Sequence, residues 1–230
     1  MTYSLYYSPD SANIVIRMAL EELGVEYDSL EVPSSRSERS ASFFSMNPRG
    51  LLPVLVDYQT EATVFETGAA LLYLADKHRK LAPSPDEHAA RAECLKWLFM
   101  FSNTLHADLA RNFYPERHAD GPEVARSVKF ISEKRVASHF KLLDRHIADS
   151  NAEWFLPSGL SICDFYLGCC ARWAQLYPED DPALTSAEIK AYTALTALLR
   201  RTEGLESVKT ALEKEGISGP AFVDPVKTTP

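Results

Sequence analysis

The sequence contains few cysteines and no excess of positive charge. Its four cysteines, Cys94, Cys163, Cys169 and Cys170, all lie beyond the first third of the 230 residues, without a C-x-x-C pair or zinc-ligand spacing. We therefore expect buried free thiols and no metal site. With 24 Lys and Arg against 32 Asp and Glu, the formal charge of -8 argues against nucleic acid as the main partner.

Long apolar runs are also missing. No stretch approaches the roughly 20 apolar residues that a membrane-spanning helix needs. The first ten residues, MTYSLYYSPD, lack the basic and apolar regions of a secretory signal. We therefore expect a cytoplasmic protein with no membrane partner. The chain is long enough for one large domain or two small ones.

The first 78 residues mix the apolar period of strands with that of helices. Four short runs have the pattern of strands, over residues 3–7, 27–32, 53–57 and 63–66. Two amphipathic stretches predict helices, over residues 12–23, ended by Gly24, and over residues 67–78. The first strand, helix and second strand form a β-α-β unit, which implies a parallel strand pair. The last two strands suit a hairpin, and the polar segment 33–44 predicts a loop with a short irregular helix.

Residues 79–88, RKLAPSPDEH, interrupt the apolar period with prolines and charges, and everything beyond them has the pattern of helices. Five helical stretches follow, over residues 87–114, 123–150, 161–177, 186–202 and 205–216. The last residues predict a tail that is extended along the surface or frayed. The sequence thus predicts a small α/β domain (1–78), a linker (79–88), an all-helical domain (89–215) and an extended tail (216–230).

The segment NPRGLLPVLVD combines a turn with a proline at the start of a strand. A cis bond between Leu52 and Pro53 would leave the N–H and C=O of Leu52 unpaired and facing outwards. An extended, peptide-like ligand could then bind there as an added strand. The alternative is an ordinary trans proline at a strand edge, which is the commoner form.

The segment VFETGAALLYLAD places Glu66 and Thr67 at the start of a helix, with Thr67 at the cap position. A helix N-terminus offers unpaired N–H groups and the positive end of the helix dipole, both suited to a carboxylate. Glu66 could bind an ammonium group of the same ligand, so that the pair would recognise the head group of an amino acid. Plain helix capping by Thr67 is the alternative.

The turn SPDSAN, residues 8–13, lies between the first strand and the first helix. Such a turn often carries a reactive cysteine at the helix start. This one holds hydroxyls, a carboxylate and an amide but no cysteine, so any nucleophile that acts here has to come from elsewhere.

Together, this turn, NPRGLLPVL, FETGAALLYLAD and a helical bundle resemble the cytosolic glutathione transferase family. SICDFYL adds an S-x-x-D capping box, Ser161 and Asp164, of the kind that this family carries in its helical domain. The likeness spans essentially the whole chain, and the nearest classes are the bacterial beta class and the serine-using theta and phi classes. It implies a thioredoxin-like N-terminal domain and an all-helical C-terminal domain. It also implies a homodimer in which the helical domain packs against the partner's thioredoxin-like domain.

The resemblance implies that the nucleophile is the cysteine thiol of bound glutathione, which the protein keeps as a thiolate. Lowering a thiol pKa by two units from about 8.5 needs about 2.7 kcal/mol, and one hydrogen bond to a charged group supplies about 1.5–3 kcal/mol. Ser11 is the best candidate donor, because P-D-S resembles the proline-x-serine turn of the serine-using classes. Asn13 is the second, because Ala12 then falls where the beta class has its cysteine. Ser8 and Tyr7 are further candidate donors. The alternative to thiol activation is that these hydroxyls only cap the helix.

By the same resemblance, glutathione would contact Leu52, Pro53, Glu66 and Thr67. Arg39 or Arg49 would supply the cation for its glycyl carboxylate, since Leu51 stands where the family usually has a polar residue.

The second substrate would lie against the helical domain. Asn103, His106, Ala110 and Phe113 share one helix face. His106 could steer the substrate or protonate a leaving group, because histidine titrates near neutrality; a hydrogen-bonded, partly buried histidine is equally consistent. Further candidate walls are Arg111, Tyr114, Trp173 and Tyr177, although aromatic residues on apolar helices more often belong to the core.

The predicted function is the addition of glutathione to a hydrophobic electrophile, in detoxification. One alternative is another glutathione-dependent reaction, such as that of a peroxidase, dehalogenase, etherase or isomerase. A second is a binding module of the same fold without turnover.

Overall fold

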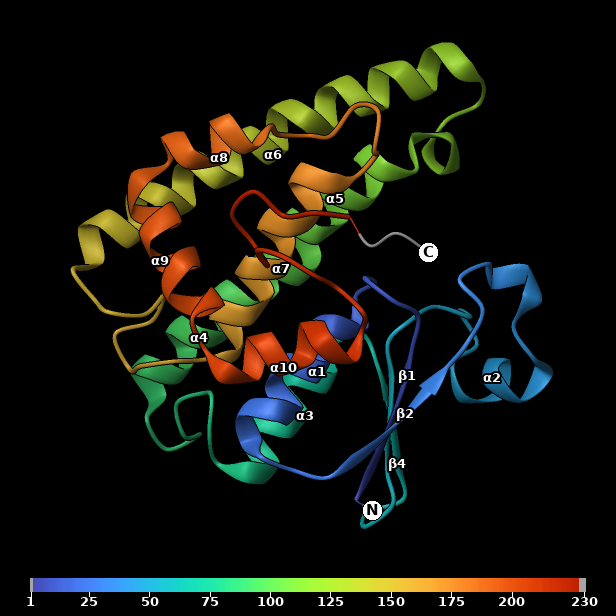
Figure 1. The fold of residues 1–230 in the computed structure, drawn as a ribbon, viewed down its shortest axis with the longest axis vertical. Coiled ribbons are helices and arrows are strands. Elements are labelled where there is room, and N and C mark those ends of the chain that lie inside the picture. The colour runs from blue at the N-terminus through green and yellow to red at the C-terminus, as the bar shows by residue number, and fades with distance from the viewer. Residues whose placement is uncertain (1, 228–230) are drawn as a thin grey trace.

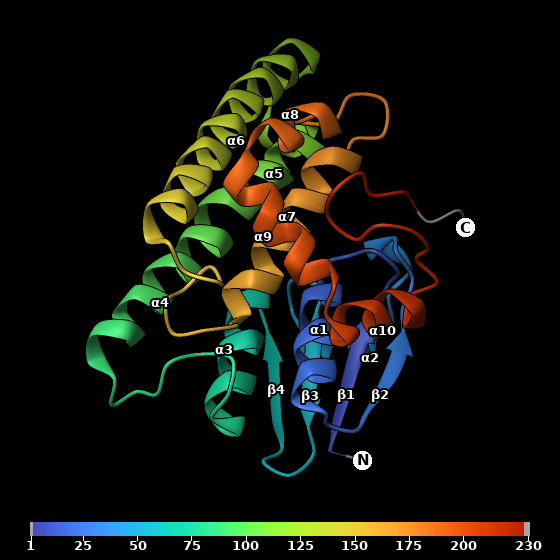
Figure 2. The same cartoon turned by 60° about the vertical axis from the view of Figure 1, so that its left-hand side comes forward.

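A four-stranded sheet forms the centre of the N-terminal third of the chain. The computed structural model describes residues 2–227. The strands are β1 (Tyr3–Tyr7), β2 (Tyr27–Glu31), β3 (Val54–Asp57) and β4 (Ala62–Phe65), in the order β2-β1-β3-β4. β1 is parallel to β2 and antiparallel to β3, and β3 and β4 form an antiparallel hairpin. The predicted β-α-β unit and hairpin are thus confirmed, and Figure 2 shows the strands side by side.

Helix α1 (Asn13–Leu23) lies between this sheet and the helices of the C-terminal part, in contact with α3, α7 and α10. Because it is covered on several sides, all residues from Asn13 to Leu20 are buried. Gly24 ends the helix in the left-handed conformation (φ 66°), which glycine adopts without steric cost, and its N–H bonds back to Glu21 O. The other helices of this part are α2 (Ala41–Met46) and α3 (Thr67–His78).

The rest of the chain is helical (Figure 1). The helices are α4 (His88–Met100), α5 (His106–Phe113), α6 (Pro122–Ser150), α7 (Ile162–Leu176), α8 (Ser186–Ala191), α9 (Thr193–Glu203) and α10 (Glu206–Lys214). α7 is buried from Ile162 to Gln175 and forms the centre of this part. Its start carries the predicted capping box: Ser161 Oγ accepts from the Cys163 N–H, and the Asp164 carboxylate accepts from the Ser161 N–H at 2.8 Å.

Two of the predicted helices are interrupted. The stretch 87–114 contains a π-helical turn, Phe101–Leu105, between α4 and α5. The stretch 186–202 divides at Tyr192 into α8 and α9 because Asp144 of α6 accepts the N–H of Leu195 at 2.9 Å and starts a new helix there. Residues 79–87 connect α3 to α4, and His88, the last residue of the expected linker 79–88, is the first residue of α4. We propose this segment as the linker between two domains. Within residues 2–227, no helix has both the length and the apolar character needed to span a membrane.

The prediction of a surface or frayed tail fails at four residues that follow α10, whereas residues 218–220 and 224 are exposed as expected. The four side chains that are at most 5% exposed are Ile217, Ala221, Phe222 and Val223. The backbone N–H groups of Phe222 and Val223 donate to the carboxylate of Glu203 at 2.5 and 2.7 Å, which satisfies donors that burial would otherwise leave unpaired. Residues 228–230, the end of the predicted tail, lie outside the described part of the chain.

Gly168 of α7 makes room for this buried tail. A Cβ at residue 168 would lie 2.7 Å from two ring carbons of Phe222. Gly168→Ala should therefore lower the free energy of unfolding by about 1–3 kcal/mol through overpacking, as measured by urea denaturation. Adding Phe222→Leu should recover part of that loss, because a smaller side chain removes the clash. An unchanged urea midpoint in Gly168→Ala would contradict this packing.

Candidate functional site

The turn at residues 8–13 joins β1 to α1 and is built around the side chain of Asn13. Asn13 Oδ1 accepts the Ser8 N–H at 3.2 Å and the Ser11 hydroxyl, and Asn13 Nδ2 donates to Glu215 Oε1 at 2.6 Å. Asn13 is fully buried, so its amide is enclosed by the protein's own groups. Ser11 is partly exposed at the start of α1. Of these two candidate donors, the structure leaves Ser11 accessible to a ligand thiol and Asn13 not.

Ser8 and Tyr7, the further candidate donors, also have hydrogen-bond partners within the protein. Ser8 is 4% exposed, and its hydroxyl lies 2.7 Å from Ser34 Oγ. Tyr7 donates to Glu31 at 3.4 Å, and the Arg17 guanidinium lies 4.6 Å from the Tyr7 ring centre. Burial raises the pKa of Tyr7 above its ordinary value. Both hydroxyls are therefore engaged with other parts of the N-terminal third.

Ala12 occupies the N-cap of α1 and has no side chain that could cap the helix. The first N–H groups of α1 therefore lack a side-chain acceptor at the positive end of the helix dipole. Ser11 immediately precedes this position. A hydroxyl and a helix N-terminus thus lie together, and both favour a negatively charged ligand atom.

The segment before β3 presents unpaired backbone groups. The Leu52–Pro53 peptide bond is cis, the less common of the two forms considered from the sequence. Over residues 2–227, neither the N–H nor the C=O of Leu52 has a hydrogen-bond partner. The neighbouring Leu51 is held by a hydrogen bond from Asn47 Nδ2 to its carbonyl at 2.9 Å. Leu52 can therefore pair with an extended peptide backbone.

The two candidate arginines differ in how far they are already engaged. Arg39 donates to the carbonyl oxygens of Pro33, Ser34 and Gly50 at 2.9, 3.0 and 2.5 Å, so its guanidinium holds this loop together. Arg49 forms an ion pair with Glu66, and both side chains are more than half exposed. Exposed ion pairs of this kind contribute little stability, so Arg49 is the arginine that a ligand carboxylate can recruit more readily.

Glu66, and not Thr67, occupies the N-cap of α3, which corrects the cap position expected from the sequence. Thr67 is the first helical residue, and the cap has no side-chain hydrogen bond. The first intrahelical bond runs from the Ala70 N–H to Glu66 O, so the N–H groups of residues 67–69 point out of the helix end. Glu66 has a φ of 71°, a strained conformation for this residue type that is often found at binding sites.

The start of α3 faces the helical part, and α3 packs against α7. On α7, the Tyr166 hydroxyl lies 3.0 Å from His106 Nδ1. The His106 ring packs against Trp173 with 4.8 Å between ring centres. Burial lowers the pKa of His106 to about 4. The imidazole is therefore neutral near pH 7, and a role as a proton donor from the charged form is disfavoured.

A row of aromatic rings leads from the surface to the 8–13 turn. Tyr114, 44% exposed, packs edge-on against Phe113 with 6.3 Å between ring centres. Phe113 packs against Tyr177 at 5.9 Å, and the Tyr177 hydroxyl donates to Asp10 Oδ2 at 3.0 Å. Asn103, from the same predicted face, is exposed in the π-helical turn. The candidate walls Phe113, Tyr114 and Tyr177 thus form one surface next to the turn.

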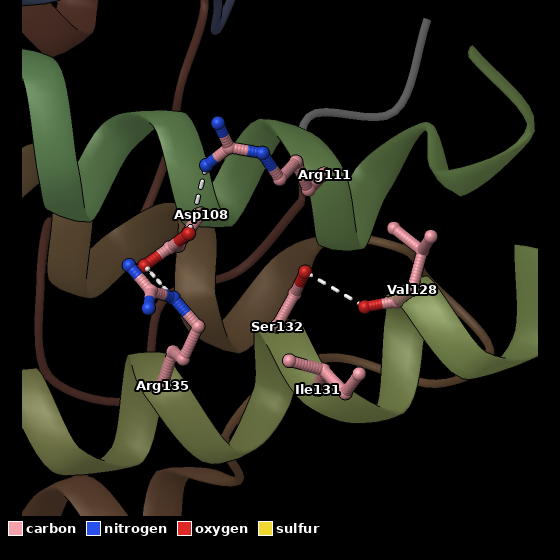
Figure 3. A pocket seen from close by; sticks show the side chains of 6 residues that line it. All are labelled: Asp108, Arg111, Val128, Ile131, Ser132 and Arg135. Atoms are coloured by element: carbon pink, nitrogen blue, oxygen red, sulfur yellow. Dashed lines mark hydrogen bonds and ion pairs between the residues drawn. The ribbon is translucent and has the colours of Figure 1, made fainter. Parts of the chain in front are cut away.

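Arg111 does not belong to that surface. It pairs with the buried Asp108 at 2.8 Å, as does Arg135 of α6. Both arginines line a hollow of about 340 Å³ between α5 and α6 (Figure 3). The residues that line it are Asp108, Arg111, Val128, Ile131, Ser132 and Arg135. Arg111 therefore lies apart from the aromatic surface next to the turn.

The sequence interpretation missed Asp10, Arg172 and Glu215, which hold the turn from the C-terminal side. A signal for Arg172 exists in the sequence, because it is a single charge within the apolar stretch YLGCCARWAQLY and such charges are almost never buried unless paired. No sequence signal indicates its partner, Asp10. Among the described residues, no three His, Cys, Asp or Glu side chains cluster as metal ligands would.

Comparison with known proteins assigns the family. A model of the glutathione S-transferase N-terminal domain matches residues 1–76, and a model of the glutathione S-transferase C-terminal domain matches residues 103–215. The chain belongs to the glutathione S-transferase family. The resemblance seen in the sequence and the predicted fold, a thioredoxin-like domain followed by a helical domain, are thereby confirmed.

Several related proteins align with most of this chain. Glutathione S-transferase GstA of Escherichia coli O157:H7 is 25% identical over 219 residues, which is 93% of this chain and 98% of that protein. A sphingomonad glutathione S-transferase complexed with glutathione has the same fold, with a TM-score of 0.78 at 24% identity over 94% of this chain and 100% of that one. The transcriptional regulator URE2 of Saccharomyces cerevisiae is 28% identical over 139 residues, 57% of this chain and 39% of that protein.

The low pKa of His106 has a measurable consequence. The folded protein should keep this imidazole neutral down to about pH 4, whereas the unfolded chain takes up the proton near pH 6.5. The unfolded state then binds more protons in that window, so His106 should lower stability as the pH falls from about 6.5 to 4. The ring signal of His106 in an NMR titration should show a midpoint near 4 in the folded protein. A midpoint above 6 would contradict the burial.

Proposed function

We propose that this protein binds glutathione between Ser11, Leu52 and Thr67 and activates its thiol for attack on a hydrophobic electrophile. The observation that carries this proposal is the start of α3, where the N–H groups of residues 67–69 have no cap and Glu66 precedes them in a strained conformation. These groups fit the carboxylate and ammonium of a γ-glutamyl head group.

The remaining parts of glutathione follow from the same geometry. The cysteinyl backbone would pair with the N–H and C=O of Leu52 beside Pro53, as an added strand. Its glycyl carboxylate, at the other end of the tripeptide, would bind Arg49 after that exposed guanidinium leaves Glu66, since Arg39 is held by loop carbonyls. The thiol would then lie at the start of α1, next to Ser11.

Thiol activation requires modest energy. One hydrogen bond from Ser11 to the thiolate supplies about 1.5–3 kcal/mol, and the N-terminus of α1 adds about 0.3–1 kcal/mol. Lowering the thiol pKa by two units requires about 2.7 kcal/mol. Ser11 would have to turn its proton from Asn13 Oδ1 to the sulfur, which needs only a rotation about the C–O bond. No cysteine of the protein takes part.

The electrophile would lie against the aromatic row and the neutral His106. Phe113 and Tyr114 supply apolar surface, and the buried Trp173 supports the His106 ring from behind. Holding the electrophile near the thiolate supplies the proximity that accelerates attack. His106 would orient the electrophile as a neutral hydrogen-bonding group. We also propose a cytoplasmic location. We further propose a homodimer, and gel filtration at micromolar concentration tests this oligomeric state.

A different glutathione-dependent reaction, or binding without turnover, is the alternative. The similarity to URE2, named a transcriptional regulator, favours considering the second. Chloronitroaromatic conjugation measured beside hydroperoxide reduction separates conjugation from peroxidase activity. Binding to immobilised glutathione without turnover in either assay would support the binding module.

Ser11→Ala should raise the thiolate pKa of bound glutathione by about one to two units, because the loss of one hydrogen bond to a charged group costs about 1.5–3 kcal/mol. The thiolate ultraviolet absorbance, followed against pH, measures this. Affinity from calorimetric titration should change little. Ser127→Ala, an exposed serine on α6, is the control and should leave both values unchanged. The same absorbance profile in Ser11→Ala and in the unmodified protein would contradict the role of Ser11.

Glu66→Gln should weaken glutathione binding about tenfold or more while leaving the thiolate pKa in place, because Glu66 contacts the ammonium and not the sulfur. Calorimetric titration gives the affinity and ultraviolet absorbance gives the pKa. Glu61→Gln, an exposed residue in the β3–β4 turn, is the matched control. Equal affinities in the two variants would show that Glu66 does not bind the head group.

A further inference from the structure

The carboxylate of Glu215 holds the 8–13 turn from the far end of the chain. Its Oε2 accepts the Asp10 backbone N–H at 2.8 Å, and its Oε1 accepts Asn13 Nδ2 at 2.6 Å and Arg17 Nε at 2.9 Å. The side chains of Glu215 and Arg17 are both fully buried. Three donors from the turn and α1 thus converge on one carboxylate that directly follows α10.

The side chain of Asp10 is held separately by α7. Arg172 donates to both of its carboxylate oxygens, from Nε at 2.7 Å and from Nη2 at 2.8 Å. These side chains are at most 2% exposed. Arg172 also donates to the carbonyl oxygens of Ala221 and Val226 at 3.2 and 3.1 Å. The C-terminal segment that crosses α7 in Figure 1 is therefore tied to the same turn.

Ser11 lies between these two anchored positions. Asp10 precedes it, with its N–H on Glu215, its carboxylate on Arg172 and a φ of 53° that a non-glycine residue adopts at a cost. Asn13, two residues later, accepts a hydrogen bond from the Ser11 hydroxyl and itself donates to Glu215. The orientation of the Ser11 hydroxyl thus depends on Glu215 and Arg172, which lie in the C-terminal third of the sequence.

We propose that Glu215 and Arg172 are positioning residues for the thiol-activating turn, so that the C-terminal segment sets how strongly the protein stabilises a thiolate at Ser11. This rests on the proposed function. Buried ion pairs often stabilise a fold no better than apolar residues of the same volume would. The two pairs here instead define a backbone conformation that apolar contacts, which lack direction, would leave variable.

Glu215 and Arg172 should affect the stability of the thiolate and not the affinity for glutathione. The groups proposed to bind glutathione, at Leu52, Arg49, Glu66 and Thr67, form no hydrogen bond or ion pair with Glu215 or Arg172 in the described part of the chain. Glu215→Gln keeps the shape of the side chain but loses its charge and one acceptor oxygen, so at least one of its three donors loses its partner. The turn should loosen while the binding groups stay in place.

The test compares Glu215→Gln with Glu213→Gln, an exposed glutamate two residues earlier. With bound glutathione, the thiolate absorbance of Glu215→Gln should shift to higher pH by about one unit or more, equivalent to a tenfold loss of thiolate below its pKa. The dissociation constant should change less than threefold. Glu213→Gln should match the unmodified protein in both. Arg172→Lys, which keeps the charge but loses the two-point contact, should shift the absorbance in the same direction and serves if Glu215→Gln fails to fold.

The outcomes are distinguishable. A thiolate band in the unmodified protein that stays at the same pH in folded Glu215→Gln and Arg172→Lys overturns the positioning role and leaves the proposed function standing. A parallel loss of affinity and thiolate in both variants indicates general loosening of the fold and also overturns it. If the unmodified protein binds glutathione without a thiolate band, the proposed function is wrong and this inference falls with it.

Discussion

The structure around the 8–13 turn depends on one buried carboxylate. Glu215 accepts hydrogen bonds from the Asp10 backbone, the Asn13 amide and the Arg17 guanidinium. An unpaired buried carboxylate costs several kcal/mol or more, so these donors have to stay in place for the chain to fold with Glu215 inside. The requirement is reciprocal. The turn needs the carboxylate to hold its conformation, and the buried carboxylate needs the donors of the turn and of α1 in place of water. The N-terminal sheet and the last helix are joined at this point.

Two uncapped helix ends complete the site. α1 begins after Ala12 and α3 after Glu66, and neither cap residue has a side-chain hydrogen bond to its helix. Serine, threonine and aspartate are the residues that cap a helix best. At both of these helix starts N–H groups lack a side-chain acceptor, and at α1 the Ile14 N–H bonds to the Ser11 carbonyl instead. Under the proposed function the turn needs no cysteine, because a turn that stabilises a charge on a ligand needs donors and no nucleophile of its own.

Most of the fold could be predicted because its elements follow from local pattern. The four strands, the long helices and the Ser161–Asp164 capping box depend on apolar period and on residues within one turn of each other. The errors arose where a distant group decides. The tail is buried at residues 221–223 because Glu203 accepts N–H groups there and Gly168 leaves room for Phe222. The helix predicted over 186–202 divides because Asp144 caps its second half.

Short sequence segments are enough to identify the candidate residues of the site: the SPDSAN turn, Leu52 with Pro53, and Glu66 with Thr67. Which of these residues stay accessible depends on how the chain packs. Asn13 is enclosed because Glu215 reaches it from 202 residues away, and Arg39 is occupied by loop carbonyls while Arg49 is exposed. The reason is physical: local pattern sets backbone periodicity, whereas burial and hydrogen-bond partners depend on which distant side chains pack beside a residue.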